Sequence, residues 1–156
     1  MRILILLCLP LLNFAQQTYI PDDKFEQKLI NLGYDNILDD SVLTSSIDTV
    51  TYLELVWDSV VDLTGIEDFN SLTYLNYFGL GIFFPMAPPI NIDLSQNTAL
   101  ITLQLIGAQI TSLDLSNNTA LEYLDCMSNQ LTSLDLSNNT ALTHLYCHNN
   151  QLTSLD

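Results

Sequence analysis

Apolar residues recur along the second half of the chain at a fixed spacing. Residues 92–109 read IDLSQNTALITLQLIGAQ, residues 113–130 read LDLSNNTALEYLDCMSNQ, and residues 134–151 read LDLSNNTALTHLYCHNNQ, so each stretch begins 21 residues after the previous one. Self-similarity at a fixed period of this length is the signature of a stacked architecture, in which each repeat contributes one turn. The sequence therefore predicts a solenoid.

Within one repeat, the apolar positions define a short strand and its inward face. Residues 121–131 fit the pattern LxxLxLxxNxL, with Cys126 in a leucine position. Side chains of a strand alternate between its two faces, so Leu124 and Cys126 are expected inward and Tyr123 outward. The asparagine that follows the strand is expected to turn the chain and to bond backbone groups that no strand satisfies. This pattern is typical of leucine-rich repeats.

Four further turns carry the pattern with different fidelity. Residues 142–152 match it with Cys147 in a leucine position, and residues 100–110 match it with Ala108 in the asparagine position. Two looser turns precede these. The first comprises Val50, Leu53, Leu55 and Val60, and the second comprises Leu72, Leu75, Tyr77 and Ile82.

One turn is longer than the others. Leu75 and Leu103 are 28 residues apart, seven more than the period, and we assign the additional residues to 79–90, which read GLGIFFPMAPPI. Loops usually run over the surface, and an exposed apolar patch often marks a contact site. The loop could equally fold back over the first turns, and the sequence leaves both interpretations open.

A short helix is expected before the first repeat. Asp23 and Glu26 have the spacing of a capping box, with Pro21 just before them, and Gly33 is a natural helix stop. The apolar face of this helix comprises Phe25, Leu29 and Leu32. The helix would cover the open apolar end of the first turn, as the terminal units of solenoids do.

The N-terminus has the pattern of an export signal. Arg2 precedes an apolar run from Ile3 to Leu12, and Ala15 ends a weak cleavage site. The run is too short to span a bilayer, and no other segment is long and apolar enough to do so. We therefore predict a signal peptide at residues 1–15, a helical cap at 16–49 and repeats at 50–156 that end in mid-repeat, which suggests a truncated chain that is secreted or held at the cell surface.

The repeats resemble those of bacterial secreted leucine-rich-repeat proteins, broadly internalin-like. The resemblance covers Val50 to Asp156, and the segment from Tyr19 to Asp48 looks like the N-terminal cap of such proteins. It implies an α/β solenoid, a right-handed coil of about five turns with parallel strands. It also implies a module that binds proteins, glycans or surfaces, without indicating which.

The net charge of the chain makes some classes of binding partner less favourable. The chain carries 18 acidic residues against three basic ones, a net charge of −15. This balance argues against nucleic acid or an anionic membrane surface as partner. Because 48% of the residues are hydrophobic, the acidity does not indicate disorder.

Stacking the turns aligns the outward strand residues in three columns. The first column is Tyr52, Tyr74, Thr102, Tyr123 and His144; the second is Glu54, Asn76, Gln104, Asp125 and Tyr146; the third is Val56, Phe78, Ile106, Met127 and His148. Tyrosine and histidine offer a rigid surface with a polar tip, which suits recognition. The same residues could instead pack across strands and only stabilise the sheet.

We interpret this concave strand face as the ligand-binding surface, because the opposite side is rich in serine, asparagine and threonine. The candidate binding residues are Tyr52, Glu54, Tyr74, Asn76, Phe78, Gln104, Tyr123, Asp125, Met127, His144, Tyr146 and His148.

An acidic column is expected on the return side of the turns. It comprises Asp93, Asp114, Asp135 and Asp156. Stacked carboxylates repel one another, and calcium, hydrogen bonds from the serines two residues on, or solvation could offset this repulsion. A separate acidic segment, 35–40, lacks the glycine and the closing glutamate of an EF-hand loop and is interpreted as a solvated turn.

The cysteines and histidines do not form a reactive site in this register. Cys126 and Cys147 occupy equivalent inward positions, with parallel Cβ vectors that disfavour a disulfide, and are expected as core thiols. His144 and His148 lack a third metal ligand and a neighbouring nucleophile. We therefore expect neither an enzyme nor a cofactor.

The leading functional hypothesis is an extracellular or cell-surface module that binds a protein or a glycan through the strand face. The alternative is a structural spacer that carries other domains. Self-association is a further possibility, because the last turn would expose apolar residues beside an unpaired strand edge. These residues are Leu142, Leu145, Leu152 and Leu155.

Overall fold

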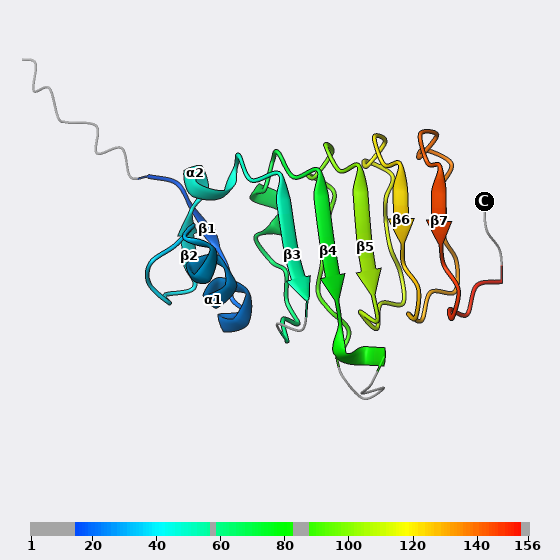
Figure 1. Ribbon diagram of the computed structural model, residues 1–156, viewed down its shortest axis with the longest axis horizontal. Coiled ribbons are helices and arrows are strands. Elements are labelled where there is room, and N and C mark those ends of the chain that lie inside the picture. The colour runs from blue at the N-terminus through cyan, green and yellow to red at the C-terminus, as the bar shows by residue number, and fades with distance from the viewer. Residues whose placement is uncertain (1–14, 57–58, 83–87, 154–156) are drawn as a thin grey trace, which may run out of the picture.

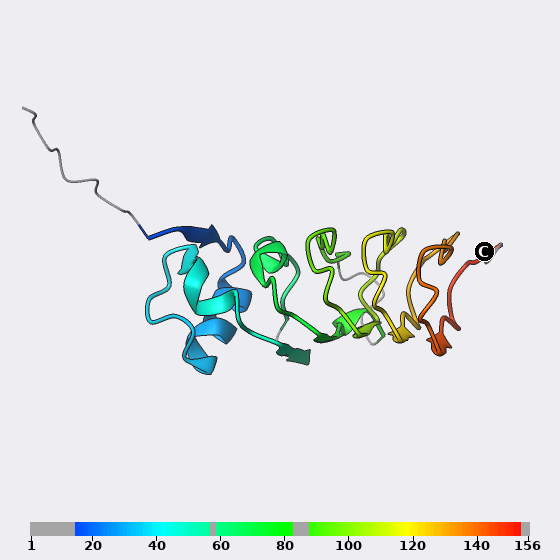
Figure 2. The same ribbon diagram turned by 90° about the horizontal axis from the view of Figure 1, so that it is seen from above.

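The computed structural model describes residues 15–56, 59–82 and 88–153. A five-stranded parallel sheet runs along the molecule with its strands in chain order (Figure 1). Its strands are β3 (Tyr52–Val56), β4 (Tyr74–Phe78), β5 (Thr102–Ile106), β6 (Tyr123–Asp125) and β7 (His144–Tyr146). Each strand belongs to one turn, and the return segments line the opposite side of the molecule (Figure 2). The predicted solenoid with parallel strands is confirmed.

The strand register is the one that the repeat pattern predicts. Leu124 pairs with Leu103 on one side and with Leu145 on the other, and Tyr123 pairs with Thr102 and His144. Leu124 is fully buried. Leu145 is only partly buried, because β7 is the edge strand of the sheet and the core is covered there on one side alone.

Asparagine side chains bond the backbone of the turns at two places, at the strand ends and on the return side. At the strand ends, Asn129 Nδ2 donates to the carbonyl oxygens of Leu105 and Cys126, and its Oδ1 accepts from the Ile110 amide. Asn150 repeats this arrangement one turn on. The predicted role of the strand-end asparagine is thereby confirmed.

A second asparagine ladder follows the return side. It comprises Asn97, Asn118 and Asn139, all buried. Each Nδ2 donates to two backbone carbonyls, as Asn118 does to those of Leu94 and Asn97 at 3.1 and 3.0 Å. Each of these carbonyls also accepts from a backbone amide, so the asparagine side chain supplies a second donor to its oxygen.

The N-terminal unit covers the first turn. It contains β1 (Gln17–Tyr19), α1 (Asp23–Leu32), β2 (Ser41–Leu43) and α2 (Thr44–Ile47), with β1 and β2 antiparallel. Phe25 and Leu29 of α1 are fully buried in the same core as the repeats. The Phe25 ring stacks on that of Phe69, with centroids 6.1 Å apart. The helix therefore closes the apolar end of the sheet, next to β3.

The start of α1 differs from the prediction. Asp22, not Asp23, caps the helix: its Oδ1 accepts from the amides of Lys24 and Phe25. Its Oδ2 accepts from the amides of Val61 and Asp62, which belong to the first turn. One carboxylate thus joins the cap to the repeats.

Glu26 does not complete a capping box either. It is fully buried, and its carboxylate accepts hydrogen bonds from the amides of Asp39, Asp40 and Ser41. The acidic segment 35–40 is therefore organised around a buried glutamate. Gly33 ends the helix as predicted, with φ at 82°.

The long turn contains the short helix η2 (Leu80–Ile82), after which the chain returns to the core at Ile90. The prediction that Ile82 fills the core was wrong: Ile82 is 39% exposed, whereas Ile90 is buried. The amides of Gly79 and Gly81 bond the carbonyls of Ile106 and Gly107, which holds η2 outside the solenoid. Residues 83–87, on which the two interpretations of the apolar loop depend, lie outside the described residues.

Residues 1–14, which make up nearly all of the predicted signal peptide, also lie outside the described residues. Within the described part of the chain, no helix has the length and apolarity that crossing a membrane requires.

Candidate functional site

The outward side chains of β3 to β7, together with Met127 and His148, form one surface, which we call the strand face. The pairing registers align Tyr52 with Tyr74, and Glu54 with Asn76 and Gln104, as the three columns predict. Its candidate residues differ in exposure. Tyr52, Glu54, His144, Tyr146 and His148 are exposed; Tyr74, Asn76, Phe78, Gln104, Tyr123 and Met127 are partly buried; Asp125 is buried.

An aromatic pair lies at the end of the strand face next to the cap. The rings of Tyr52 and Tyr74 are stacked, with centroids 4.5 Å apart and planes within 11°. The Tyr74 hydroxyl donates to Gln104 Oε1 at 2.9 Å. A hydrogen bond with Glu54 raises the pKa of Tyr52 to about 12, so its hydroxyl remains protonated at neutral pH.

A second aromatic group lies at the other end. The Tyr123 ring stacks on the His144 ring, with centroids 5.8 Å apart, and contacts the Tyr146 ring at 5.6 Å. Thr143 Oγ1 lies 2.8 Å from His144 Nδ1 and helps to orient that ring. Tyr123 is therefore only partly exposed, where the register argument alone expected full exposure.

The columns did not anticipate these additional contacts. Tyr123 and Tyr146 belong to different columns, and their contact is a diagonal one between neighbouring strands. Thr143 precedes β7 and so lies in no column. Because each column was considered separately, neither the Tyr123–Tyr146 contact nor the contact of Thr143 was predicted. Diagonal neighbours on a sheet are nevertheless within reach of aromatic side chains.

Asp125 is the main departure from the expected surface. It lies on the outward side of β6 yet is only 4% exposed. Its Oδ1 accepts a hydrogen bond from the Met127 amide at 3.1 Å. Burial raises the pKa of this carboxyl group, against the opposing effects of the Met127 amide and of His148.

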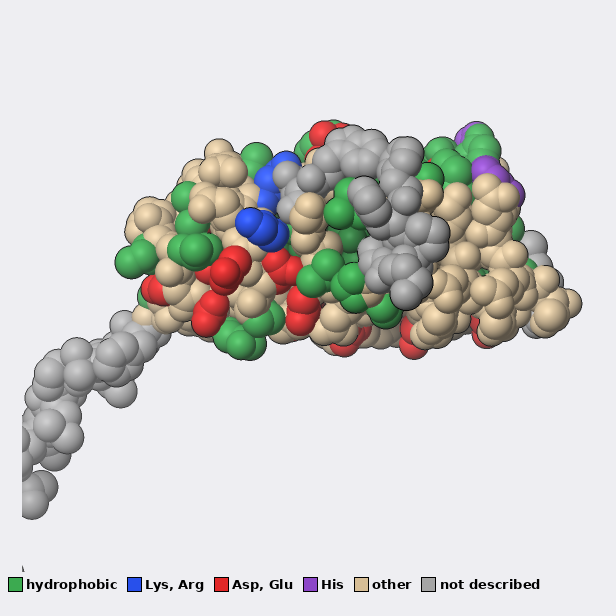
Figure 3. All heavy atoms as spheres, turned by 90° about the horizontal axis from the view of Figure 1, so that it is seen from below, with side chains coloured by type: hydrophobic (Ala, Val, Ile, Leu, Met, Phe, Trp, Pro, Cys, Tyr) green, Lys and Arg blue, Asp and Glu red, His purple; other side chains and the backbone are tan. Residues whose placement is uncertain are grey.

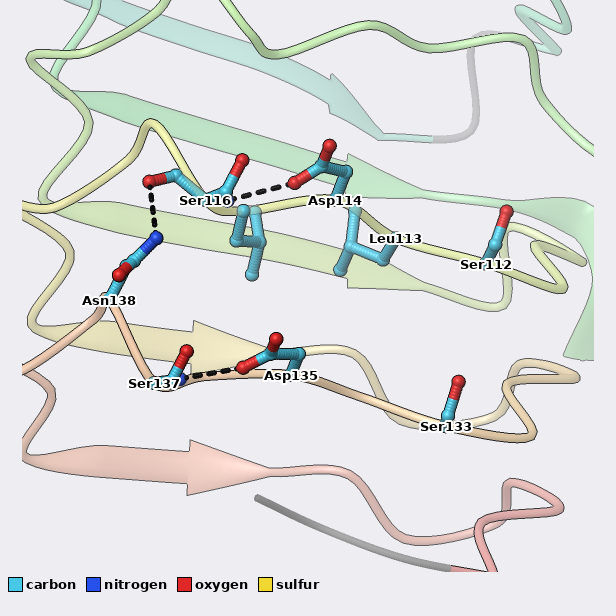
Figure 4. A pocket seen from close by; sticks show the side chains of 9 residues that line it. Ser112, Leu113, Asp114, Ser116, Ser133, Asp135, Ser137 and Asn138 are labelled. Atoms are coloured by element: carbon cyan, nitrogen blue, oxygen red, sulfur yellow. Dashed lines mark hydrogen bonds between the residues drawn. The ribbon is translucent and has the colours of Figure 1, made fainter.

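A groove of about 280 Å³ lies on the return side, between the turns that carry Asp114 and Asp135 (Figure 4). Each carboxylate accepts a hydrogen bond at 2.9 Å from the backbone amide of the serine two residues on, Ser116 or Ser137. These bonds lower the pKa of both aspartates. The serine amides thus stabilise the acidic column; Asp156 lies outside the described residues.

The described residues contain no group of three or more His, Cys, Asp or Glu side chains placed to hold an ion. Cys126 is buried, Cys147 is partly buried, and both thiols are free, as the sequence predicted for core positions. Burial is also the main cause that raises the pKa of Cys126 to about 12, which leaves its thiol unreactive.

Known proteins share this architecture. Residues 119–156 match the family described as Leucine Rich repeats (2 copies). The functional domain of InlJ from Listeria monocytogenes, described as including a cysteine ladder, superposes with a TM-score of 0.72 at 32% identity over 91% of this chain. This chain spans 31% of the InlJ chain.

Two further internalins of Listeria monocytogenes share the fold with a TM-score of 0.56 each. Internalin C2 is 21% identical and covered over 78% of its chain, and internalin F is 22% identical and covered over 46%. They align with 91% and 87% of this chain respectively. No curated protein matches the sequence.

The parallel sheet, the asparagine ladders and these matches define a leucine-rich-repeat protein. In its repeat and its fold, the chain is internalin-like.

Proposed function

We propose that the chain is an extracellular or cell-surface binding module that recognises a protein or a glycan through the strand face. The observation that carries this proposal is the pair of aromatic groups around Tyr74 and Tyr123. Rigid aromatic side chains with polar tips are enriched where proteins bind partners. Residues 1–15 would act as the signal peptide that exports the chain.

The return side offers a clear contrast. Its exposed residues are mostly Ser, Thr, Asn and Asp, and several of their polar groups already bond the backbone, as those of Asp114 and Asn117 do. The same uniform polarity would suit a structural spacer, which is the alternative function. A spacer would need no aromatic surface on the strand side, so we favour binding.

A paired set of variants tests the proposal. One variant carries Tyr74→Ala, Tyr123→Ala and Tyr146→Ala, and its control carries Thr111→Ala, Thr132→Ala and Thr153→Ala on the return side. Protein and glycan arrays are probed with both variants and with the unchanged chain. The tyrosine variant is expected to lose about 1–2 kcal/mol of binding free energy for each hot-spot residue, while the threonine variant keeps its ligands.

Stability must be followed in both variants. Each tyrosine change is expected to cost within about 1 kcal/mol of unfolding free energy, from lost cross-strand packing. Ligand loss in the threonine variant alone would assign binding to the return side. An unchanged chain that binds nothing on either array would favour the spacer.

Self-association is a second property that the edge of the sheet supports. Leu142, Leu145 and Leu152 are only partly buried beside β7, whose outer backbone groups form a sheet edge. Sedimentation of residues 16–156 is expected to show concentration-dependent oligomers. A monomer at high concentration would exclude this contact.

InlJ is described as including a cysteine ladder. Cys126 and Cys147 occupy equivalent positions on adjacent turns of this chain, and we propose that they form the corresponding feature.

A further inference from the structure

One oxygen atom on the strand face lacks a hydrogen-bond donor among the described residues: Asn76 Oδ1 is buried and unpaired. A buried polar atom without a partner costs free energy, so a ligand that donates a hydrogen bond would stabilise it. Asp125 is only 4% exposed, and the hydrogen bond that it accepts from the Met127 amide involves Oδ1. A carboxylate can accept further hydrogen bonds through its other oxygen, so a donating ligand would stabilise this group too.

These atoms belong to a continuous line of acceptors across four strands. Glu54, Asn76, Gln104 and Asp125 occupy register-matched positions on β3, β4, β5 and β6. We call this line the acceptor column. It carries two carboxylates, and none of its members is cationic.

The described lysines lie away from the Asp125 end of this column, where His148 is the neighbouring basic side chain. The chain has three basic residues, of which Lys24 and Lys28 lie on α1 in the described part. Figure 3 shows the lysine side chains over the N-terminal cap, at the opposite end of the molecule from the histidines. The strand face is therefore complementary in charge to a basic ligand.

Aromatic rings border the acceptor column at the point where it is most buried. Asp125 pairs in register with Tyr146, and Tyr123 lies two residues before it on the same face. The faces of such rings attract ammonium and guanidinium groups, more strongly when water is excluded. A cation on Asp125 would thus contact a carboxylate and two aromatic rings at once.

We propose that the occupant of the strand face is an extended segment of a partner protein that bears arginine or lysine and crosses the strands along the acceptor column. This inference rests on the proposed function and specifies its ligand. Glu54 and Asp125 lie three strand spacings apart, about 14 Å. An extended chain covers that distance in about four residues, so cations at positions i and i+4 match the two carboxylates.

The direction of the pKa shift of Asp125 is consistent with a cationic ligand at this position. Burial raises the pKa of Asp125, whose neighbours on the face include His148, Tyr146 and Tyr123. A bound guanidinium would favour the ionised carboxylate and donate hydrogen bonds to it.

The test uses short fluorescent peptides that carry arginine at every fourth position, with glycine and serine between. A matched peptide carries citrulline in place of arginine, which keeps the shape and removes the charge. Binding is measured by fluorescence anisotropy at physiological ionic strength, where the Debye length of about 8 Å weakens the general attraction of an acidic chain for any cation.

Two double variants with the same change of net charge separate the acceptor column from that general attraction. Glu54→Gln with Asp125→Asn alters the column, and Asp114→Asn with Asp135→Asn alters the return side. The amides retain the oxygens that accept backbone hydrogen bonds, so circular dichroism spectra should be unchanged. Tyr146→Leu, at an exposed position, is an independent variant that removes one aromatic border.

The strand-face pair is expected to weaken binding of the arginine peptide by about tenfold, and Tyr146→Leu by several-fold. The return-side pair should change it by less than about twofold, and the citrulline peptide should not bind. Equal weakening by both pairs, or equal binding of both peptides, would overturn the proposal. Array ligands that need the tyrosines but ignore Glu54 and Asp125 would refute this inference while leaving the proposed function intact.

Discussion

At the scale of single residues, the buried asparagines of the return side connect adjacent turns by hydrogen bonds. Asn118 is fully buried, and its side chain donates to the carbonyls of Leu94 and Asn97 in the turn before it. Asn117, its neighbour in sequence, is exposed and makes one hydrogen bond to the Ser95 carbonyl. Adjacent residues of the same type thus have different structural roles.

We expect Asn118→Ala to lower the free energy of unfolding by about 1–3 kcal/mol, because it removes two buried hydrogen bonds and leaves the carbonyls of Leu94 and Asn97 with one backbone amide donor each. Asn117→Ala is the matched control and should cost within about 0.5 kcal/mol. Urea denaturation of both variants measures the difference. Equal losses would mean that the buried ladder contributes no more than an exposed hydrogen bond.

Two aspartates, Asp125 and Asp114, are expected to change the stability with pH in opposite directions. The pKa of Asp125 is raised by burial, so folding favours its protonated form, and stability relative to Asp125→Asn should increase as the pH falls through that pKa. The pKa of Asp114 is lowered by the Ser116 amide, so its contribution is present at neutral pH and is lost as the pH falls through the lowered value.

Thermal unfolding of Asp125→Asn and Asp114→Asn from neutral to acid pH provides the measurement. Relative to the unchanged chain, Asp125→Asn should become less stable as the pH falls. Asp114→Asn should regain stability relative to the unchanged chain over the same change of pH. Parallel pH profiles for the two variants would contradict the assigned causes.

The positions of single side chains could be predicted from the sequence only where the backbone pattern determines them. It placed Leu124 inward and Asn129 at the turn because a period of two and a fixed repeat leave no alternative register. It chose Asp23 over Asp22 as the helix cap, since both are acidic and adjacent. What distinguishes them is the pair of amides from Val61 and Asp62, which come from a distant part of the chain.

At the scale of elements, the junction between the cap and the first turn depends on one glycine. Gly65 has φ at 99°, and a Cβ atom there would lie 2.7 Å from the Tyr19 carbonyl oxygen in β1. Gly33, at the end of α1, also has a positive φ but has open space where a Cβ would lie. The two glycines share a backbone requirement and differ in contact with the rest of the chain.

Gly33→Ala should therefore cost about 1–2 kcal/mol of unfolding free energy, from the left-handed conformation alone. Gly65→Ala adds overpacking against β1 and should cost about 3 kcal/mol or more. Chemical denaturation compares the two variants. A smaller loss for Gly65→Ala would show that β1 can move away without affecting the repeats.

The elements of the repeats were predictable, and those of the long turn were not. In the repeats, the leucines at the inward positions determine where each strand lies and which of its faces is buried. In the long turn, Ile82 and Ile90 are both apolar and both follow glycine or proline, so composition does not say which returns to the core. The choice is made by backbone bonds from Gly79 and Gly81 to the next turn.

At the scale of the whole molecule, the inward leucines are fully buried from β3 to β6 and only partly buried on β7. Leu124 on β6 is fully buried, whereas Leu145 on β7 is only partly so. In a solenoid each turn contacts its neighbours alone, so local stability follows local burial. The C-terminal turns are thus expected to open most often.

Hydrogen exchange should show this difference between β7 and the strands before it. The amides of β4 and β5, each between two strands, are expected to exchange at least about tenfold more slowly than those of β7. Mass spectrometry of peptic fragments, or nuclear magnetic resonance, makes the comparison. Uniform protection from β3 to β7 would mean that the turns unfold as one unit.

The alignment of the strand-face residues in columns was predictable, because the stacking of the turns follows directly from the period. The burial and the contacts of these residues were less predictable. The burial of Asp125 and the contact between Tyr123 and Tyr146 depend on how neighbouring side chains lean across strands, which a list of outward positions does not contain.

The hydrogen bonds that the buried and partly buried asparagines make between turns all join a turn to the one before it in the chain. Asn118 donates to the carbonyl of Asn97, Asn139 to that of Asn118, and Asn150 to that of Cys126. Each turn thus finds these partners in the turn synthesised before it. A chain that emerges N-terminus first, from a ribosome or an export pore, can close each new repeat onto a surface that is already complete. Folding then proceeds by steps of low contact order, from the cap outward.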